Sequence, residues 1–520
     1  MTTEDAQAIL ARAGRAFSEG RYADAAADFR ALTASHPDVG ELYINLGAAL
    51  RGAGDKQGAQ KALREAVKLL PESAAAWFNL ANLLSADKRA EDAIAAYEKA
   101  DALQPGTPEI LNNFGVQLYE SGQIEDALEK YDTALAADPR FADALTNRGN
   151  ALQRMCRMDD AGVSIDAALS LNPEHPVYRL NKSSYLAANG RHAEALEWAN
   201  KSIAADPTYT EAKLKRASLL IQTGELESGF REYEARWNMP DWHSLNETLP
   251  MPAWRGEDVE NKTLLVWNEQ GFGDALIYAR YLPILRARGV QVRLMCEKPL
   301  MRLFKRSFED IDVFPLDATP PAADLHCSIM SLPFLMGTSM ATIPSDVPYL
   351  KPDRTDVKRW RDETTDDRPA VGLIWAGNPG QAHDYSRSLS PKSIMPLIDR
   401  DDLRFYNLLV GPRGNEIADA RVVDVRAQLN DFAQTAALMQ NLDLVISVDS
   451  APAHLAGALG RPLWVLLAFD PDSRYFLKHT NSPWYPTAQL MRQPAPGDWA
   501  SVIEQATTAL DTFVRTKAKR

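Results

Sequence analysis

The sequence predicts an all-α repeat superhelix followed by two α/β half-domains, each built on a parallel sheet. Three observations predict this fold class. Prolines recur every 34 residues through the first half of the chain. That periodicity ends near Trp237, and from Lys262 onward buried-type strands alternate with helical segments, which is typical of parallel α/β folds. The 520 residues are also too many for a single core, so several domains are expected.

Composition narrows the class of protein before any motif is considered. The net charge of −13 disfavours a nucleic-acid partner. Cys156, Cys296 and Cys327 lie far apart and predict neither a disulfide framework nor a zinc site. The N-terminus lacks the pattern of a secretory signal, and no apolar run approaches the roughly 20 residues that cross a bilayer. We therefore expect a cytoplasmic protein without a membrane span.

The first half repeats a 34-residue unit. Its prolines are Pro37, Pro71, Pro105, Pro139, Pro173 and Pro207. Alanine stands twelve residues before each proline, where it lets two amphipathic helices approach closely, and the proline ends the second helix. Glycines are expected in the left-handed conformation where the first helix ends: Gly54, Gly122, Gly190 and Gly224. The pattern resembles the tetratricopeptide repeat and implies six to seven repeats over residues 1–238.

Asparagine stands eight residues after five of these prolines. The five are Asn45, Asn79, Asn113, Asn147 and Asn181, and Lys215 interrupts the series. The position falls on the first helix of each repeat, which lines the groove of such a superhelix. An amide both donates and accepts, so the ladder predicts a peptide-binding groove, or else bonds between neighbouring helices. It resembles the ladder of O-linked N-acetylglucosamine transferases, which implies a protein acceptor.

The second half alternates strands with helices. Strands are expected at 263–267, 290–295, 311–314, 324–327, 370–375, 405–410, 442–447 and 462–467, with a helix at 275–288. The half-domains would cover 262–350 and 370–500. Linkers are expected at 239–261 and 351–369, and a C-terminal helix with a basic tail at 501–520.

Two loop motifs carry a closer resemblance. Gly271-Phe272-Gly273-Asp274 follows the first strand, and Asp449-Ser450-Ala451-Pro452-Ala453-His454 follows the strand at 442–447. With the segment Asn481–Thr487, they resemble the heptosyltransferase-like glycosyltransferases of family 9. The resemblance implies a GT-B fold, in which two Rossmann-like halves bind a nucleotide sugar at the carboxyl ends of their strands. The half at 262–350 is short for that family, and the solenoid would replace part of its acceptor lobe.

Donor binding is predicted at the second of these loops, where a helix N-terminus suits an anion. By resemblance, this loop holds the diphosphate. Asp449 would cap the helix or bind donor hydroxyls, and His454 would reach the diphosphate or the leaving group. Ser450 and Ala451 lie in the same loop.

A second donor loop, 377–388, follows the strand at 370–375. Arg387 is predicted to hold the diphosphate because a guanidinium matches phosphate oxygens, and Ser388 or Ser390 would cap the next helix and offer a hydroxyl. Lys392 is the alternative cation. Gly271 and Gly273 would allow close approach of the donor or acceptor.

Inverting transfer needs a base that takes the proton of the acceptor hydroxyl, and the resemblance implies that Asp274, the acid of the Gly-Asp pair after the first strand, fills that role. Its alternative role is to cap a helix, and Glu269 and His383 are alternative bases. No metal or cofactor is expected. The Asp-x-Asp pairs at 310–312 and 470–472 are interpreted as accidental.

These predictions together describe an inverting, metal-independent glycosyltransferase that moves a sugar from a nucleotide sugar to a protein acceptor in the repeat groove. Flagellin before export is one candidate acceptor. One alternative is a glycan or lipopolysaccharide-type acceptor with the same chemistry. Another is a repeat scaffold whose transferase fold is inactive.

Overall fold

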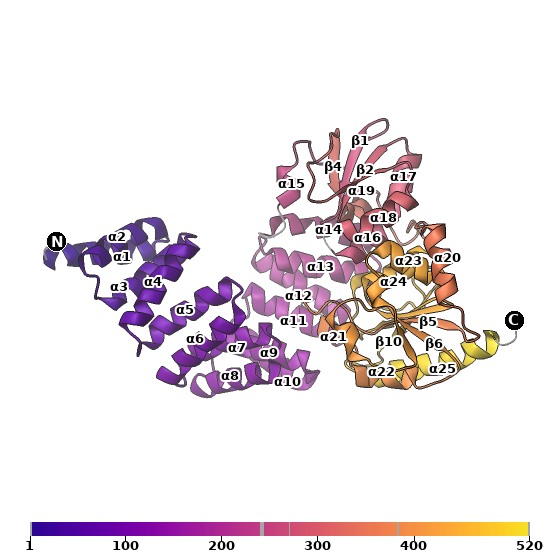
Figure 1. The fold of residues 1–520 in the computed structure, drawn as a ribbon. Helices are drawn as coiled ribbons and strands as arrows, with labels where there is room; N and C mark the ends of the chain where they lie inside the picture. The colour runs from indigo at the N-terminus through magenta and orange to yellow at the C-terminus, as the bar shows by residue number, and fades with distance from the viewer. Residues whose placement is uncertain (1–2, 240–243, 270, 382–383, 518–520) are drawn as a thin grey trace. The chain divides into compact units, whose positions relative to one another are not determined.

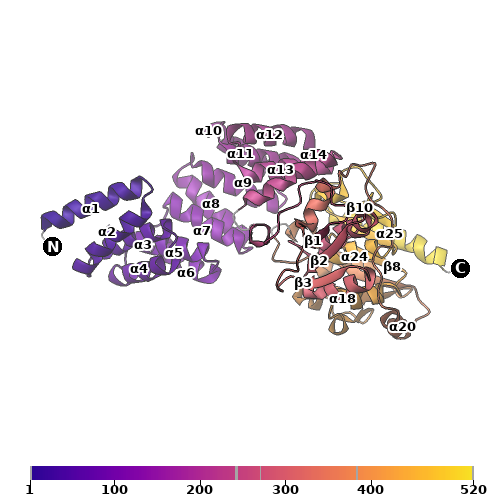
Figure 2. The ribbon, with the colours of Figure 1, turned by 90° about the horizontal axis from the view of Figure 1, so that it is seen from above.

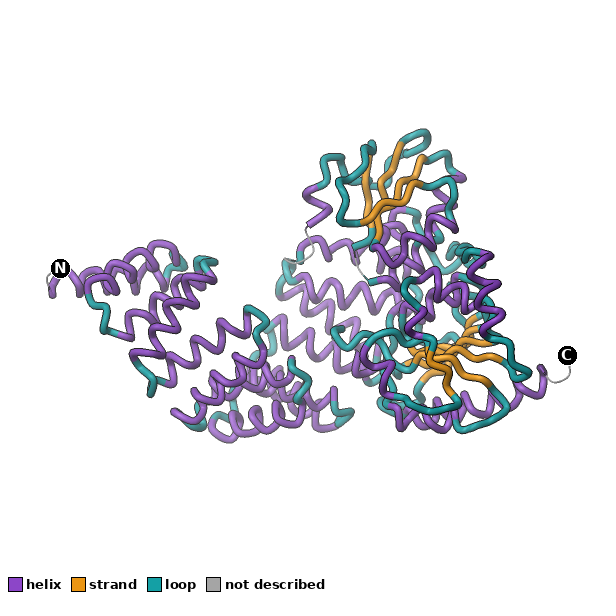
Figure 3. The backbone as a smooth tube through the Cα atoms, in the orientation of Figure 1, coloured by secondary structure: helices purple, strands orange, loops and turns teal. Residues whose placement is uncertain are grey.

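The computed structural model describes residues 3–239, 244–269, 271–381 and 384–517. The chain divides into two compact units, residues 1–182 and 183–520. Within the described residues, the first unit is built from helices, and strands occur only in the second (Figures 1 and 3). This order of an all-α part before a parallel α/β part confirms the predicted fold class.

The repeats form fourteen helices in the described part of the chain. They are α1 (Thr3–Ser18), α2 (Tyr22–Ser35), α3 (Gly40–Gly52), α4 (Lys56–Leu69), α5 (Ala74–Ala86), α6 (Ala90–Leu103), α7 (Pro108–Glu120), α8 (Ile124–Ala137), α9 (Ala142–Arg154), α10 (Met158–Leu171), α11 (Pro176–Ala188), α12 (His192–Ala205), α13 (Thr210–Thr223) and α14 (Leu226–Tyr233). The six periodic alanines are fully buried, which lets the paired helices pack closely. Gly54, Gly122, Gly190 and Gly224 have positive φ, as predicted.

The boundary between the two units lies inside the repeat array and not at its end. Helices α12, α13 and α14 belong to the second unit, and Figure 1 shows them stacked in chain order, while Figure 2 shows the same helices from above. The chain then passes through η1 (Glu234–Asn238) and α15 (Ser244–Thr248). The last repeats are therefore part of the same compact body as the sheets.

The first sheet of the second unit has four parallel strands in the order β3-β2-β1-β4. They are β1 (Thr263–Trp267), β2 (Gln291–Cys296), β3 (Asp312–Pro315) and β4 (Leu325–Ser328), with α16 (Phe272–Tyr278), α17 (Tyr281–Ala287), α18 (Lys298–Ser307), η3 (Ile329–Ser331) and α19 (Leu332–Leu335). The expected linker 239–261 packs on this sheet, because the Trp254 N–H donates to the His326 carbonyl at 2.7 Å.

The helix predicted at 275–288 is two helices, because α16 ends before Ala279 and α17 begins at Tyr281. Pro283 lacks an N–H, and its ring would clash with the carbonyl of residue 279 in a continuous helix. Arg280 at the break is 3% exposed and donates to the carbonyls of Pro344 and Trp484. Pro283 was the residue that indicated this break, although the hydrophobic pattern on both sides of it is that of one helix.

The second sheet has six parallel strands in the order β10-β9-β8-β5-β6-β7. They are β5 (Ala370–Ile374), β6 (Arg404–Asn407), β7 (Val422–Asp424), β8 (Leu444–Val448), β9 (Leu463–Leu467) and β10 (Ala488–Arg492). Around them lie α20 (Arg354–Glu363), α21 (Asp384–Arg387), α22 (Pro391–Ile398), η4 (Pro412–Glu416), η5 (Arg426–Gln428), α23 (Phe432–Met439), α24 (Ala451–Ala458), η6 (Ser473–Tyr475) and α25 (Trp499–Lys517). Strands β5 and β8 are buried throughout, as expected of a parallel sheet covered on both faces.

Three elements of this half were not predicted. Strands β7 and β10 lie at the two edges of the sheet, and α20 occupies the charged segment that was expected to be a linker. Asp353 caps α20 by accepting from the Thr355 N–H at 2.8 Å, and Trp360 is the fully buried residue that anchors the helix. One buried tryptophan among charged residues gives little periodic signal.

Each sheet has a point where the strand order reverses, and ligands of open α/β sheets bind at such points. The reversal lies between β1 and β4 in the first sheet and between β5 and β8 in the second. The loops after β1, β5 and β8 therefore open at these two points. They are the loops that carry the predicted site residues.

Candidate functional site

The loops of the two sheets meet through a helix contact. Helix α16, which follows β1, packs against α24, which follows β8, and Figure 1 shows both helices between the sheets. Gly273 makes this contact possible, because a Cβ there would lie 3.1 Å from His454 Cδ2 and 3.6 Å from Ala451 Cα. At Gly271 a Cβ would have Gln381 of the loop after β5 within 4.0 Å. The structure thus brings together the three predicted loops.

The loop after β5 is folded tightly around Arg387. The guanidinium contacts Asp384 at 3.3 Å and Asp449 at 3.8 Å, and it also donates to Gln381. A Cβ on Gly377 would collide with Asp384 and lie 2.7 Å from Arg387 Nε, so only glycine leaves room for this arrangement. The Gly377 N–H donates to Ser388 Oγ at 2.9 Å. Ser388 therefore shapes the loop that places Arg387.

Asp384 is shared between two arginines. Arg413 Nη1 contacts its Oδ2 at 3.0 Å while Arg387 contacts its Oδ1. Asp384 is 5% exposed, so the pair of guanidinium groups is fixed in place by a buried carboxylate. Arg413 adds a second positive charge to this side of the site, and the sequence patterns did not single it out.

The loop after β8 differs from the prediction in its cap. Ser450, and not Asp449, occupies the N-cap position of α24, and it makes no side-chain capping bond. Its hydroxyl instead bonds Ser447 Oγ at 2.9 Å. The carboxylate of Asp449 faces Arg387 and lies 3.9 Å from His454 Nε2. Burial, followed by repulsion from Asp472, raises the pKa of Asp449 to about 6.

His454 is 2% exposed and lies against two tyrosines. Its Nδ1 bonds Tyr485 Oη at 3.2 Å, and its ring stacks on Tyr475 with 5.9 Å between centroids. Burial and the charge of Arg474 hold the pKa of His454 well below its ordinary value, so the imidazole is neutral. Its Nε2 is buried without a hydrogen-bond partner. A buried polar atom left open in this way indicates a place for a ligand atom.

Asp274 is held by a residue that sequence reasoning missed. Arg474 Nη1 donates to Asp274 Oδ1, although 200 residues separate them. Arg474 Nε also donates to Asp472 at 2.6 Å. Burial raises the pKa of Asp274, and Arg474 opposes that rise. The carboxylate is 16% exposed. The backbone N–H of Gly271 also donates to it, which agrees with the predicted capping role of Asp274.

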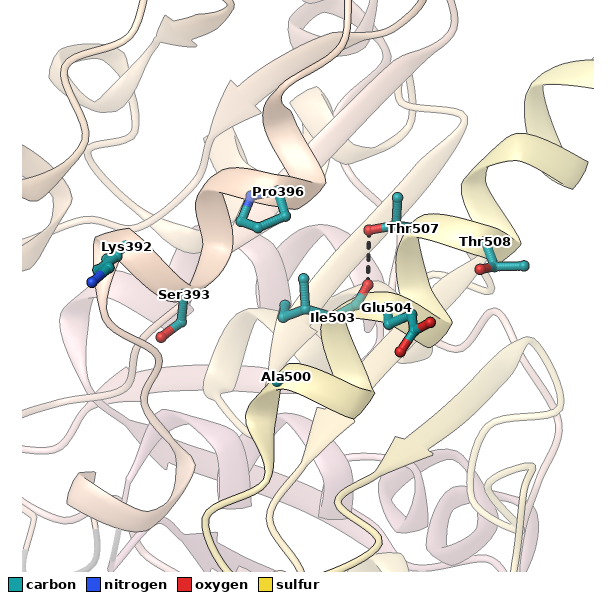
Figure 4. A pocket seen from close by; sticks show the side chains of 8 residues that line it. All are labelled: Lys392, Ser393, Pro396, Ala500, Ile503, Glu504, Thr507 and Thr508. Carbon is teal, nitrogen blue, oxygen red and sulfur yellow. Dashed lines mark hydrogen bonds between the residues drawn. The ribbon is translucent and has the colours of Figure 1, made fainter.

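The alternative residues lie elsewhere or have other partners. Glu269 contacts Arg236 at 2.9 Å, and burial raises its pKa while Arg236 opposes the rise. His383 lies outside the described residues. Lys392 lines a cavity of about 530 Å³ between α22 and α25, whose other lining residues are Ser393, Pro396, Ala500, Ile503, Glu504, Thr507 and Thr508 (Figure 4). The cavity includes none of the predicted donor residues.

The asparagine ladder lies in the first unit, on α3, α5, α7, α9 and α11. Asn113 donates to Asn82 at 3.0 Å and Asn147 donates to Asn112 at 2.9 Å, both across neighbouring first helices. Asn79 donates to the Ala75 carbonyl of its own helix at 2.9 Å. Asn45 is exposed and Asn181 is half-buried. Two of the five amides thus bond a neighbouring helix, as the helix-bonding interpretation expects, whereas Asn79 bonds its own helix.

The Asp-x-Asp pair at 470–472 has two separate partners. Asp470 accepts from Gln222 at 2.8 Å, whereas Asp472 accepts from Arg474. Within the described ranges, no three His, Cys, Asp or Glu side chains are grouped so as to hold a metal ion. In the same ranges, no helix has both the length and the apolar character needed to cross a membrane.

Family comparisons match both parts of the chain. Tetratricopeptide-repeat families match residues 10–59, 44–108, 115–155 and 157–210. The family described as glycosyltransferase family 9 (heptosyltransferase) matches residues 415–484. That match contains Asp449, His454 and Arg474 of the site.

Individual proteins match parts of the chain. Protein FlbA of Caulobacter vibrioides is 29% identical over 328 residues, which cover 57% of this chain and 54% of FlbA. The chain thus spans about half the length of this curated relative. A tetratricopeptide repeat protein of Parabacteroides merdae is 16% identical with a TM-score of 0.41, covering 46% of this chain and 94% of its own. YrrB, described as a TPR protein with an unusual peptide-binding site, is 21% identical with a TM-score of 0.30, covering 35% and 95%.

Proposed function

We propose that this chain, which joins tetratricopeptide repeats to a module like glycosyltransferase family 9, is an inverting GT-B transferase that uses a nucleotide sugar. Its acceptor would be a protein held by the repeats, with flagellin as the first candidate, and the reaction would take place in the cytoplasm without a metal ion. The observation that carries the proposal is the convergence of the loops after β1, β5 and β8 around Arg387, Asp449, His454 and Asp274.

The donor diphosphate would lie between Arg387 and the N-terminus of α24. Arg387 supplies a fixed charge, and the uncapped helix end adds the favourable end of its dipole. A neutral His454 that accepts from Tyr485 at Nδ1 carries its proton on Nε2, and this open N–H would donate to a phosphate oxygen. Such donors stabilise the charge that develops on the leaving diphosphate.

Asp449 would bind the sugar of the donor and not its diphosphate. A carboxylate repels a diphosphate, and the raised pKa of Asp449 shows that its charge is already disfavoured. A hydrogen bond from a sugar hydroxyl would satisfy this group whether it is ionised or protonated. This assignment keeps the prediction that Asp449 binds donor hydroxyls and removes its role as helix cap.

Asp274 would act as the base. Its carboxylate takes the proton of the acceptor hydroxyl while the acceptor oxygen forms a bond to the anomeric carbon on the face opposite the diphosphate. The bond from the anomeric carbon to the diphosphate oxygen breaks, and the nucleoside diphosphate leaves with the electron pair. The configuration at that carbon is inverted.

The donor site is tested by calorimetric titration with UDP, GDP, ADP, dTDP and CMP. We expect one nucleotide to bind, and Arg387→Met to weaken that binding by about 10–100-fold through loss of a charge-assisted contact. Gly377→Ala should weaken it as well, because the new Cβ displaces the guanidinium. Gly380→Ala is the matched control, since its nearest neighbour would lie 3.4 Å away. If no nucleotide binds, the scaffold interpretation replaces the transferase.

The acceptor is tested with purified flagellin monomers. If the ladder binds the peptide backbone, Asn79→Ala combined with Asn113→Ala should raise the apparent KM for flagellin by about 30-fold, since each amide bond contributes roughly 1 kcal/mol. Donor hydrolysis should stay unchanged. Gln57→Ala, at an exposed position of α4, is the control.

One observation favours the second acceptor class. The bonds of Asn113 and Asn147 inside the solenoid satisfy amides that a peptide would otherwise use. An unchanged flagellin KM in the double variant would remove the ladder from acceptor binding. Transfer to a lipopolysaccharide core oligosaccharide in place of flagellin would then identify a glycan acceptor.

A further inference from the structure

The segment 469–474, which follows β9, links two parts of the second unit. At one end it contacts the last repeats, and at the other it carries Arg474, the partner of Asp274. Arg474 lies only four positions after Asp470 along the chain. The two ends of the segment are therefore close together along the chain.

The last repeats hold this segment with several contacts. Gln222 Nε2 on α13 donates to Asp470 Oδ1 and to the Pro471 carbonyl, both at 2.8 Å. His192 Nε2 on α12 lies 3.3 Å from the same Asp470 oxygen. The ring of Phe469 would lie 3.0 Å from a Cβ on Gly190, so it packs directly on the turn between α11 and α12. Gln222 is 4% exposed, so its amide makes these two hydrogen bonds in a buried position.

The asparagine series breaks in the repeat whose first helix contacts this segment. Lys215 stands where asparagine occurs in the five preceding repeats. Its positive charge acts on Asp470 and contributes to lowering the pKa of that carboxyl, against the effect of burial. A lysine at this position complements the carboxylate of the 469–474 segment. Lysine thus replaces asparagine in the repeat where this position lies near the carboxylate of Asp470.

The last repeats also hold the loop that carries Asp274. Arg236 of η1 is fully buried, contacts Glu269 at 2.9 Å and donates to Ser331 Oγ at 2.8 Å. Glu269 lies two residues after β1, at the start of the loop that leads to Gly271 and α16. The same stretch of repeats therefore fixes both the loop before Asp274 and the segment before Arg474.

We propose that Gln222 and Asp470 are positioning residues of the transferase site, through which the last two repeats set Arg474 against Asp274. The inference rests on the proposed function. It assigns α12, α13 and η1 to the catalytic body, so the repeats do more than deliver an acceptor. The Asp470–Gln222 contact acts through Arg474 and does not itself touch the substrates.

The test is Gln222→Met in the full chain, with flagellin and the nucleotide sugar whose nucleotide binds in the titration above. Because small misplacements of reacting groups have large effects on rate, we expect kcat to fall by about tenfold or more while the donor KM stays within about twofold. The rising limb of the kcat–pH profile should move to higher pH, because a loosened Arg474 lowers the pKa of Asp274 less. Gln57→Met on α4 is the matched control.

A pair of substitutions at Asp470 separates positioning from folding. Asp470→Asn keeps an oxygen that accepts from Gln222 and should retain most of kcat, whereas Asp470→Leu should reproduce the Gln222→Met phenotype. Hydrogen exchange adds a readout that needs no activity: amides of 469–476 should exchange faster in Gln222→Met and not in Gln57→Met.

The outcomes distinguish this inference from the function on which it rests. A wild-type protein that binds a nucleotide and transfers sugar, with an unchanged kcat and pH profile in Gln222→Met, overturns the inference alone. A wild-type protein that binds no nucleotide overturns both. A lower kcat with an unchanged pH profile and equal loss in Asp470→Asn indicates general damage and also overturns the positioning role.

Discussion

Asp274→Asn is expected to lower kcat for sugar transfer by about 10²–10⁴-fold, the usual contribution of a general base. The amide has the shape of the carboxylate but cannot take the proton of the acceptor hydroxyl. Nucleotide binding should persist, because Arg387 and α24 lie on the other sheet's loops. Single-turnover transfer assays together with calorimetric titration of the nucleotide measure the two effects separately.

Glu269→Gln is the control that identifies the base. Glu269 is also a buried carboxylate beside an arginine, and it precedes Asp274 by five residues. The Glu269→Gln variant should be less stable, because Arg236 loses a charged partner, while the rate of the chemical step stays within about tenfold of wild type. A larger loss of kcat in Glu269→Gln than in Asp274→Asn would move the base assignment to Glu269. His383→Asn completes the comparison of the three candidates.

Arg474→Met is expected to destabilise the second unit by about 3–5 kcal/mol at pH 8, because it leaves buried carboxylates without their cation. Arg474 contacts Asp274 and Asp472, and its charge also acts on Asp449. Its side chain is 16% exposed, so solvent screens these contacts little. Calorimetric melting of the full chain should show a transition lowered by several degrees.

The loss of stability in Arg474→Met should grow as the pH rises. Arg474 lowers the pKa of Asp274, Asp472 and Asp449, so its loss raises all three in the folded state, with Asp449 rising from about 6. A carboxyl group whose folded pKa exceeds the unfolded value of about 3.9 contributes stability below that value and loses it as pH rises through the folded pKa. The pKa of Asp472 in the wild type lies below its ordinary value, so its contribution is lost only as pH falls below about 4. The variant should therefore approach wild type only below about pH 4 and lose stability progressively to above about pH 6.

Two further variants test the cause of this effect. Arg474→Lys keeps the positive charge and should recover most of the stability at pH 8. Arg474→Met combined with Asp472→Asn removes one of the unpaired carboxylates and should be more stable than Arg474→Met alone. Equal melting of Arg474→Met and wild type at pH 8 would mean that the cluster contributes nothing net to folding.

Much of the fold could be predicted because its signals are local and periodic. The 34-residue spacing placed every repeat, and the buried runs at 263–267, 370–375 and 442–447 indicated the strands that lead to the site. Since the carboxyl ends of parallel strands share one edge of a sheet, the loops holding Arg387 and Asp449 could be grouped from the sequence, and the resemblance to family 9 added the loop of Gly271. Two predictions were wrong because a single residue decides the local structure. Pro283 divides the helix predicted at 275–288, and the buried Trp360 anchors a helix in the segment that was predicted to be a linker.

The sequence by itself determined the order of the two architectures and the loops of the candidate site, because helix and strand periodicity and turn chemistry act within a few residues. Only the tertiary structure decided how the charges in those loops are paired. Two ion pairs and one hydrogen bond join residues that are far apart in the chain: Arg474–Asp274, Arg387–Asp449 and Gln222–Asp470. A buried charge takes the partner that packing places within a few ångströms, and no spacing along the sequence encodes that distance.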